Sequence, residues 1–129
     1  AMRAQLRSTA LLLAALLALW RRLPEYAENQ KNCRWQRLGP VRTLAGSTVL
    51  VLGFGDLGRN FARRAHLLGA RVLAVRRRPG EKPDWLEALG GPEKLEGWLP
   101  LADAAVLLLF EVVYLGLSHH TGPVFKDGL

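Results

Sequence analysis

Three short apolar runs predict the strands of a buried sheet. They lie at residues 48–52, 71–75 and 104–109. None of the runs alternates with polar residues, so both faces of the sheet should be covered, as in a parallel sheet. Between the first two runs, apolar residues recur at helical spacing over residues 57–68. That spacing predicts an amphipathic helix, which Gly69 ends.

The segments outside these runs predict one long helix, an arm and two short helices. Residues 8–23 are apolar on every face of a helix, which is typical of a helix buried all round or lying in lipid. Pro24 should stop it. The polar residues 25–45 predict an extended arm, whose aromatic side chains either pack against another subunit or lie on the surface. Residues 85–89 and 92–99 predict short helices.

Together these elements predict an α/β fold. The order strand, helix, strand, short helices, strand is typical of one half of a Rossmann-type, doubly wound parallel sheet. Here the partial sheet is preceded by a long apolar helix and an extended arm. We therefore divide the chain into residues 1–45, an apolar linker or dimerisation helix with its arm, and residues 46–129, an incomplete dinucleotide-binding domain.

Composition narrows the class of protein. The chain has 129 residues and a net charge of +7, and residues 1–45 hold eight basic and two acidic side chains. The basic residues form no block interleaved with aromatics, so we predict no nucleic-acid partner. No apolar run reaches the roughly 20 residues of a membrane span, so we predict no membrane partner. A single cysteine, Cys33, excludes an internal disulfide and favours a reducing compartment, the cytoplasm.

The first residues have a second interpretation. A basic start followed by an apolar run resembles a secretory signal. The run ends in Trp20, Arg21 and Arg22 without a small-residue cleavage site. A buried helix is therefore the favoured interpretation, and a secreted basic protein is the weaker one.

A glycine motif follows the first predicted strand. Residues 53–58 read Gly-Phe-Gly-Asp-Leu-Gly, a G-x-G-x-x-G pattern that opens the amphipathic helix. Gly53 would make the tight turn, Gly55 would let the backbone approach a pyrophosphate, and Gly58 would let the helix pack on the strand. The amides of Asp56 and Leu57 would point at the anion, while the Asp56 side chain points to solvent. The motif predicts a dinucleotide site.

The end of the second strand bears on the choice of dinucleotide. An acid there would accept hydrogen bonds from the ribose 2′-hydroxyl of NAD. In this chain Arg76, Arg77 and Arg78 follow the strand instead. Arginines suit a 2′-phosphate, so the sequence favours NADP over NAD. One or two of them could equally be solvated loop charges.

No catalytic or metal-binding set is visible in the sequence. His66 has no acid partner at a recognisable spacing, and the neighbouring His119 and His120 would need further ligands from elsewhere. We therefore predict no metal site and assign no catalytic residue.

The chain resembles the NAD(P)-binding domain of D-isomer-specific 2-hydroxyacid dehydrogenases. The resemblance covers residues 8–109 and is carried by Leu-Pro-Glu-Tyr at 23–26, Trp35, the strand entry at 44–49, the glycine motif at 53–58, His-Leu-Leu-Gly-Ala-Arg-Val at 66–72, the arginine loop at 76–79 and Leu-Pro-Leu-Ala-Asp at 99–103. It implies hydride transfer between a nicotinamide cofactor and a 2-hydroxy or 2-keto acid. It also implies a homodimer that packs through the leucine-rich helix and arm.

The resemblance also assigns residues. It implies that the amides of Asp56 and Leu57 bind the cofactor, that Arg76 selects at the ribose with help from Arg77, and that Thr121 belongs to the family's next element. The substrate domain and the catalytic arginine, glutamate and histidine of the family have no counterpart here. We therefore expect a fragment that is inactive alone, or alternatively a non-catalytic nucleotide-binding or dimerisation module.

One stretch departs from the family pattern. The family's third strand ends in a proline, whereas here residues 110–120 continue as an apolar run. An insertion, a disturbed reading frame and an artificial junction remain open as its origin. The stretch lies where the resemblance places the nicotinamide end of the dinucleotide site, so that end of the site departs from the family pattern.

Overall fold

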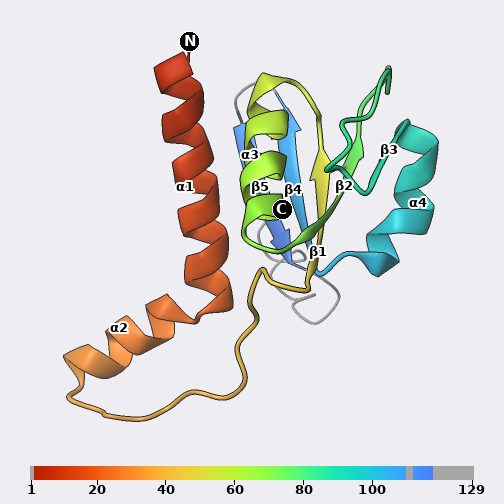
Figure 1. Cartoon of the computed structure of the whole chain (residues 1–129). Helices are drawn as coiled ribbons and strands as arrows, with labels where there is room; N and C mark the ends of the chain where they lie inside the picture. Colours follow the sequence, from red (N-terminus) through yellow and green to blue (C-terminus); the bar gives the residue numbers. More distant parts are fainter. Residues whose placement is uncertain (1, 110–111, 118–129) are drawn as a thin grey trace.

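The protein folds as a five-stranded sheet between helical layers. The structure is a computed structural model and describes residues 2–109 and 112–117. Figure 1 shows α1 and α3 on one side of the sheet and α4 on the other. The elements in chain order are α1 (Met2–Trp20), α2 (Leu23–Lys31), β1 (Thr48–Leu52), α3 (Asp56–Leu67), β2 (Arg71–Val75), β3 (Ala88–Gly90), the 3-10 turn η1 (Pro92–Lys94), α4 (Leu95–Trp98), the 3-10 turn η2 (Leu99–Leu101), β4 (Ala104–Leu109) and β5 (Val112–Leu117).

The strand order is β3-β2-β1-β4-β5. The first four strands are parallel, and β5 runs antiparallel to β4. The predicted partial Rossmann-type sheet is therefore confirmed, as are the three predicted strands and the helix between the first two. Gly69 follows that helix with a φ of 98°, a left-handed conformation that favours glycine.

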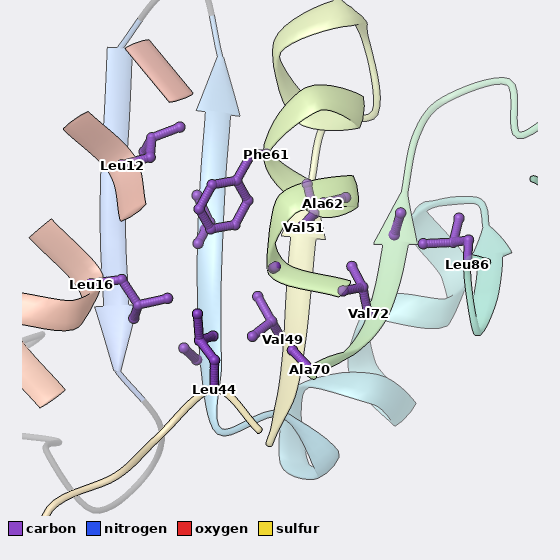
Figure 2. Packing of buried hydrophobic residues seen from close by; sticks show 14 of the residues in the cluster. Leu12, Leu16, Leu44, Val49, Val51, Phe61, Ala62, Ala70, Val72 and Leu86 are labelled. Atoms are coloured by element: carbon purple, nitrogen blue, oxygen red, sulfur yellow. The ribbon is translucent and has the colours of Figure 1, made fainter. Parts of the chain in front are cut away.

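Both faces of β1 are buried, as its unbroken apolar run predicts. Val49 and Val51 face the cluster under α1 and α3, while Leu50 belongs to the cluster under α4. Figure 2 shows Leu12 and Leu16 of α1 pointing toward the sheet beside Phe61 of α3. All six side chains are at most 2% exposed, and those of α1 and α3 belong to the same cluster as Val49 and Val51, so α1 shares one core with the sheet.

The prediction that the first helix is buried on every face is wrong for this chain. α1 forms, and it buries Leu12, Leu16 and Trp20, but Leu11 is 71% and Leu19 is 42% exposed. A helix that packs against α3 from one side leaves its outer stripe in solvent. No helix in residues 2–109 and 112–117 is long and apolar enough to span a bilayer.

The start of the predicted arm is also different, because it is helical. Arg22 takes a left-handed φ of 58°, and α2 begins directly after it with Pro24 in its first turn. Proline is tolerated there because the first amides of a helix have no intrahelical acceptor. Arg22 donates a hydrogen bond to Glu25, which lowers the pKa of Glu25 and raises the pKa of Arg22. Residues 34–43 are free of helix and strand, as the arm prediction requires.

The structure contains two strands, β3 and β5, that the sequence pattern did not predict. Ala88–Gly90 is a strand parallel to β2, so the predicted helix over residues 85–89 is wrong. The outer edge of β2 needs hydrogen-bond partners, and this pairing outweighs the local helical pattern. Part of the apolar departure, Val112–Leu117, forms β5. Short helical turns over residues 92–101 agree with the predicted helix at 92–99.

The amino ends of β1 and β4 are joined by Asp103. Its Oδ2 accepts a hydrogen bond from the Thr48 amide at 2.8 Å, and its Oδ1 accepts one from Arg42 at 2.6 Å. The Asp103 amide in turn donates to the Thr48 carbonyl at 2.8 Å. Asp103 therefore fixes the arm and two strands to each other, at the edge of the sheet opposite the glycine motif.

Candidate dinucleotide-binding site

The glycine motif lies at the carboxyl edge of the parallel sheet. β1 and β2 pair in register from Thr48 opposite Arg71 to Leu52 opposite Val75. The amide of Gly53 then donates a hydrogen bond to the Val75 carbonyl at 2.8 Å. Because parallel strands end at one edge, the turn after β1 and the loop after β2 are neighbours there. In open α/β sheets this edge is where ligands bind.

Gly53 is glycine because the backbone requires it. Its φ is 106°, a region that L side chains rarely adopt. This conformation turns the chain sharply out of β1 and directs it into α3. The turn is therefore fixed by the strand pairing on one side and by the helix on the other.

Gly55 is different, because nothing in the protein's own fold requires glycine there. It is the N-cap of α3, with φ −83° and ψ −159°, an extended conformation open to any residue. It is exposed, and a Cβ built on it would have no protein atom within 4 Å. The space that a side chain would fill lies in front of the helix. Glycine at this position therefore leaves that space open to a ligand.

The start of α3 presents backbone donors to the same space. The Arg59 amide makes the first hydrogen bond of the helix, to the Gly55 carbonyl at 2.8 Å. The amides of Leu57 and Gly58 come before it in the first turn, where an α-helix supplies no acceptor for such donors. The N-cap residue, Gly55, has no side chain that could cap the helix. Amides at a helix start, together with the helix dipole, favour an anion such as a diphosphate.

The side chains of the motif separate into two groups. Gly58 is buried, as expected for close packing of α3 on the sheet. Asp56 is exposed in the first turn of α3. A carboxylate there stabilises the helix start, although its charge opposes a bound anion.

The arginines after β2 lie at the next strand end. The Arg76 amide donates to the Gly90 carbonyl at 3.0 Å, which extends the pairing of β2 with β3 by one residue. Arg76 is the next residue after Val75, and the Val75 carbonyl accepts the hydrogen bond from the Gly53 amide. Arg76, Arg77 and Arg78 are all exposed. The structure thus brings Arg76 beside the glycine turn by backbone pairing, and Thr121 lies outside the described residues.

An aromatic group supports the turn and was not found from the sequence. Phe54 is buried, and its ring centroid lies 6.3 Å from that of Trp85, in the loop that carries the arginines. The Arg59 guanidinium carbon lies 5.6 Å from the Phe54 centroid, within cation–π range. His66 lies 5.8 Å from the Trp85 ring. The second residue of the motif therefore anchors the turn to the loop after β2.

The rest of the described chain offers no competing chemical site. It contains no group of three His, Cys, Asp or Glu side chains that could hold a metal ion. A hollow of about 760 Å³ lies away from the glycine turn, lined by residues of α2 and the arm: Tyr26, Gln30, Cys33, Arg34, Trp35, Gln36 and Arg37. It brings together no acid–base or nucleophile pair, so we assign the chemistry to the sheet edge.

The fold and the glycine turn define a Rossmann-type dinucleotide-binding unit. Comparison with known proteins identifies the family: the model of the D-isomer specific 2-hydroxyacid dehydrogenase NAD-binding domain matches residues 13–111. The chain belongs to this family of NAD(P)-dependent oxidoreductases.

Individual relatives agree with the family. Glycerate dehydrogenase of Methylorubrum extorquens is 35% identical over 66 residues, which are 46% of this chain and 21% of that protein. A D-isomer specific 2-hydroxyacid dehydrogenase family protein from Aeromonas salmonicida is 33% identical with a TM-score of 0.72, over 79% of this chain and 32% of the other. A 2-hydroxyacid dehydrogenase from Xanthobacter autotrophicus, solved with NADPH, is 28% identical with a TM-score of 0.69, over 91% and 45%. The chain thus spans between a fifth and a half of these proteins.

Proposed function

We propose that this chain binds NADP(H) at the carboxyl edge of its sheet, as the cofactor-binding part of a D-2-hydroxyacid dehydrogenase. The observation that carries the proposal is Gly55, whose Cβ position is open although its backbone conformation would accept any residue. In this proposal the amides of Asp56 and Leu57 bind the diphosphate. Arg76 and Arg77 bind the 2′-phosphate.

The reaction follows from the family and not from side chains of this chain. When bound, the nicotinamide ring gives or accepts the hydride that converts a 2-keto acid and a 2-hydroxy acid into each other. A glyoxylate/hydroxypyruvate reductase from Sinorhizobium meliloti, solved with NADP, is 25% identical with a TM-score of 0.71. Small 2-keto acids of that kind are the substrate class we propose for the complete enzyme, and the cytoplasm is its proposed location.

Direct titration tests the proposal. We expect purified protein to bind NADPH in isothermal titration calorimetry with one site per chain, more tightly than NADH. We expect no oxidation of NADPH when glyoxylate or hydroxypyruvate is added to this chain alone, because its described residues supply no identified proton donor or carboxylate-binding cation. Absence of any binding would refute the proposed function, and turnover would show that the catalytic groups are present after all.

We also propose that the chain forms a homodimer through residues 1–45, with residues 46–129 as the dinucleotide-binding domain. The outer stripe of α1 is apolar and exposed at Leu11 and Leu19, and Leu23 of α2 and Trp35 of the arm are exposed as well. An apolar surface of this kind favours association. Exposed apolar side chains thus occur both on α1 and on the arm, which extends away from the sheet in Figure 1.

Light scattering tests the dimer. We expect the native chain to have the mass of a dimer, and Leu11→Glu to shift it toward the monomer because the charge would be buried in the interface. Leu67→Glu is the matched control, since Leu67 is also 71% exposed but lies on α3. A native monomer, or an equal effect of both variants, would contradict an interface on α1.

A further inference from the structure

We propose that this chain recognises the adenosine half of the dinucleotide, with its 2′-phosphate and diphosphate, and that the nicotinamide half adds no binding energy. The inference rests on the proposed function and makes its ligand more specific: any nucleotide with a 2′-phosphoadenosine diphosphate group should bind as well as NADPH. It is carried by the direction of β5, which the sequence pattern did not predict.

The register of β4 and β5 shows where the sheet changes direction. β4 is parallel to β1, with Val49 opposite Ala104 and Leu52 opposite Leu107. β5 is antiparallel to β4, with Val112 opposite Leu109 and Leu117 opposite Ala104. Only two residues separate the strands. The chain therefore enters β5 at the edge that carries the glycine turn and leaves it at the opposite edge.

This direction matters because a dinucleotide uses two halves of a doubly wound sheet. Each half is a set of parallel strands whose carboxyl-end loops surround one mononucleotide, and the crevice lies where the strand order reverses. In this chain the reversal falls between β1 and β4. β1, β2 and β3 form the first half, and all three end at the ligand edge.

The second half has only its first strand in the part of the chain that the structure describes. β4 reaches the ligand edge and β5 begins after only two further residues, whereas a parallel neighbour would need a crossover of about a dozen residues. β5 is held in the fold as well, since it pairs with β4 along all six of its residues and contacts α1. Figure 1 shows it beside β4. The antiparallel strand takes the position from which a second parallel strand would present its loop to the nicotinamide ribose.

The charges and donors of the site lie on the same side of the reversal. The glycine turn follows β1, the exposed Arg76 and Arg77 follow β2, and Trp85 connects the two segments through Phe54. Each of these groups matches a feature of the adenosine half: two phosphates at helix amides and a third at guanidinium groups. Binding energy should therefore come from the phosphates, and removal of nicotinamide should cost nothing.

Calorimetry with dissected nucleotides tests this inference. We expect 2′-phospho-ADP-ribose, which lacks only nicotinamide, to bind with a Kd within about threefold of that of NADPH. We expect nicotinamide mononucleotide to give no measurable binding. Gly55→Val should weaken NADPH and 2′-phospho-ADP-ribose by the same factor, because both ligands use the same amides.

The possible outcomes distinguish this inference from the proposed function on which it rests. If NADPH binds tenfold or more tightly than 2′-phospho-ADP-ribose, or if nicotinamide mononucleotide binds by itself, the half-site inference is overturned while the dinucleotide site stands. Contacts from outside the described residues, with Thr121 as the first candidate, would then hold the nicotinamide half. If neither large nucleotide binds, both proposals fall together.

Discussion

Gly55→Val is expected to raise the Kd for NADPH at least about a hundredfold. The valine side chain would occupy the open space in front of α3 and keep a diphosphate away from the amides of Asp56 and Leu57. Hydrogen bonds to a charged group contribute about 1.5–3 kcal/mol each, and the loss of two accounts for this factor. Calorimetric titration of the variant with NADPH provides the measurement.

The fold should survive this substitution. The Gly55 backbone is extended and its Cβ position touches no protein atom, so the cost is that of a poorer N-cap, about 1 kcal/mol. Gly97→Val is the matched control: a Cβ at Gly97 in α4 also meets nothing within 4 Å, and the residue lies on the other side of the sheet. Its NADPH affinity should equal that of the native chain. Unchanged affinity in Gly55→Val, with both variants folded by circular dichroism, would exclude the turn as a phosphate site.

Arg76→Asp is expected to reverse the preference between the two dinucleotides. Loss of a guanidinium–phosphate contact should raise the Kd for NADPH by about ten- to a hundredfold. The new carboxylate can accept hydrogen bonds from the free ribose hydroxyls of NADH, so NADH affinity should stay equal or improve. The measured quantity is the ratio of the two Kd values, obtained by titration at low and at physiological salt.

Arg78→Asp controls for net charge. It makes the same charge change in the same exposed loop, two residues further from the strand end. We expect it to weaken NADPH only a few-fold and to lose that effect as salt rises, because the interaction acts through solvent. If Arg76→Asp leaves the ratio of the Kd values unchanged, or if both variants change it equally, Arg76 does not select the cofactor.

The sequence predicted those parts of the fold whose cause is local. The strands at β1, β2 and β4 are continuous apolar runs, and α3 has one apolar face, so each is visible within a few residues. The same holds for the glycine turn, because Gly53 needs a left-handed φ that glycine supplies. The positions of Gly55 and Arg76 at one edge then follow from parallel pairing alone.

Elements that depend on distant partners were missed. β3 is three residues long and exists because β2 offers an unpaired edge. α2 was missed because Pro24 ends helices and begins them equally well, and the left-handed Arg22 decides between the two. In the site, the contact of Phe54 with Trp85 joins segments far apart in the chain, and no spacing rule connects them.

Trp85, one of four tryptophans in the chain, gives the glycine turn an optical probe. Its indole contacts Phe54 inside the motif, and its backbone belongs to the loop after the arginines. A ligand that shifts either segment changes the surroundings of the ring and hence its emission. Binding of nucleotides that are not themselves fluorescent can therefore be followed by the change in tryptophan emission.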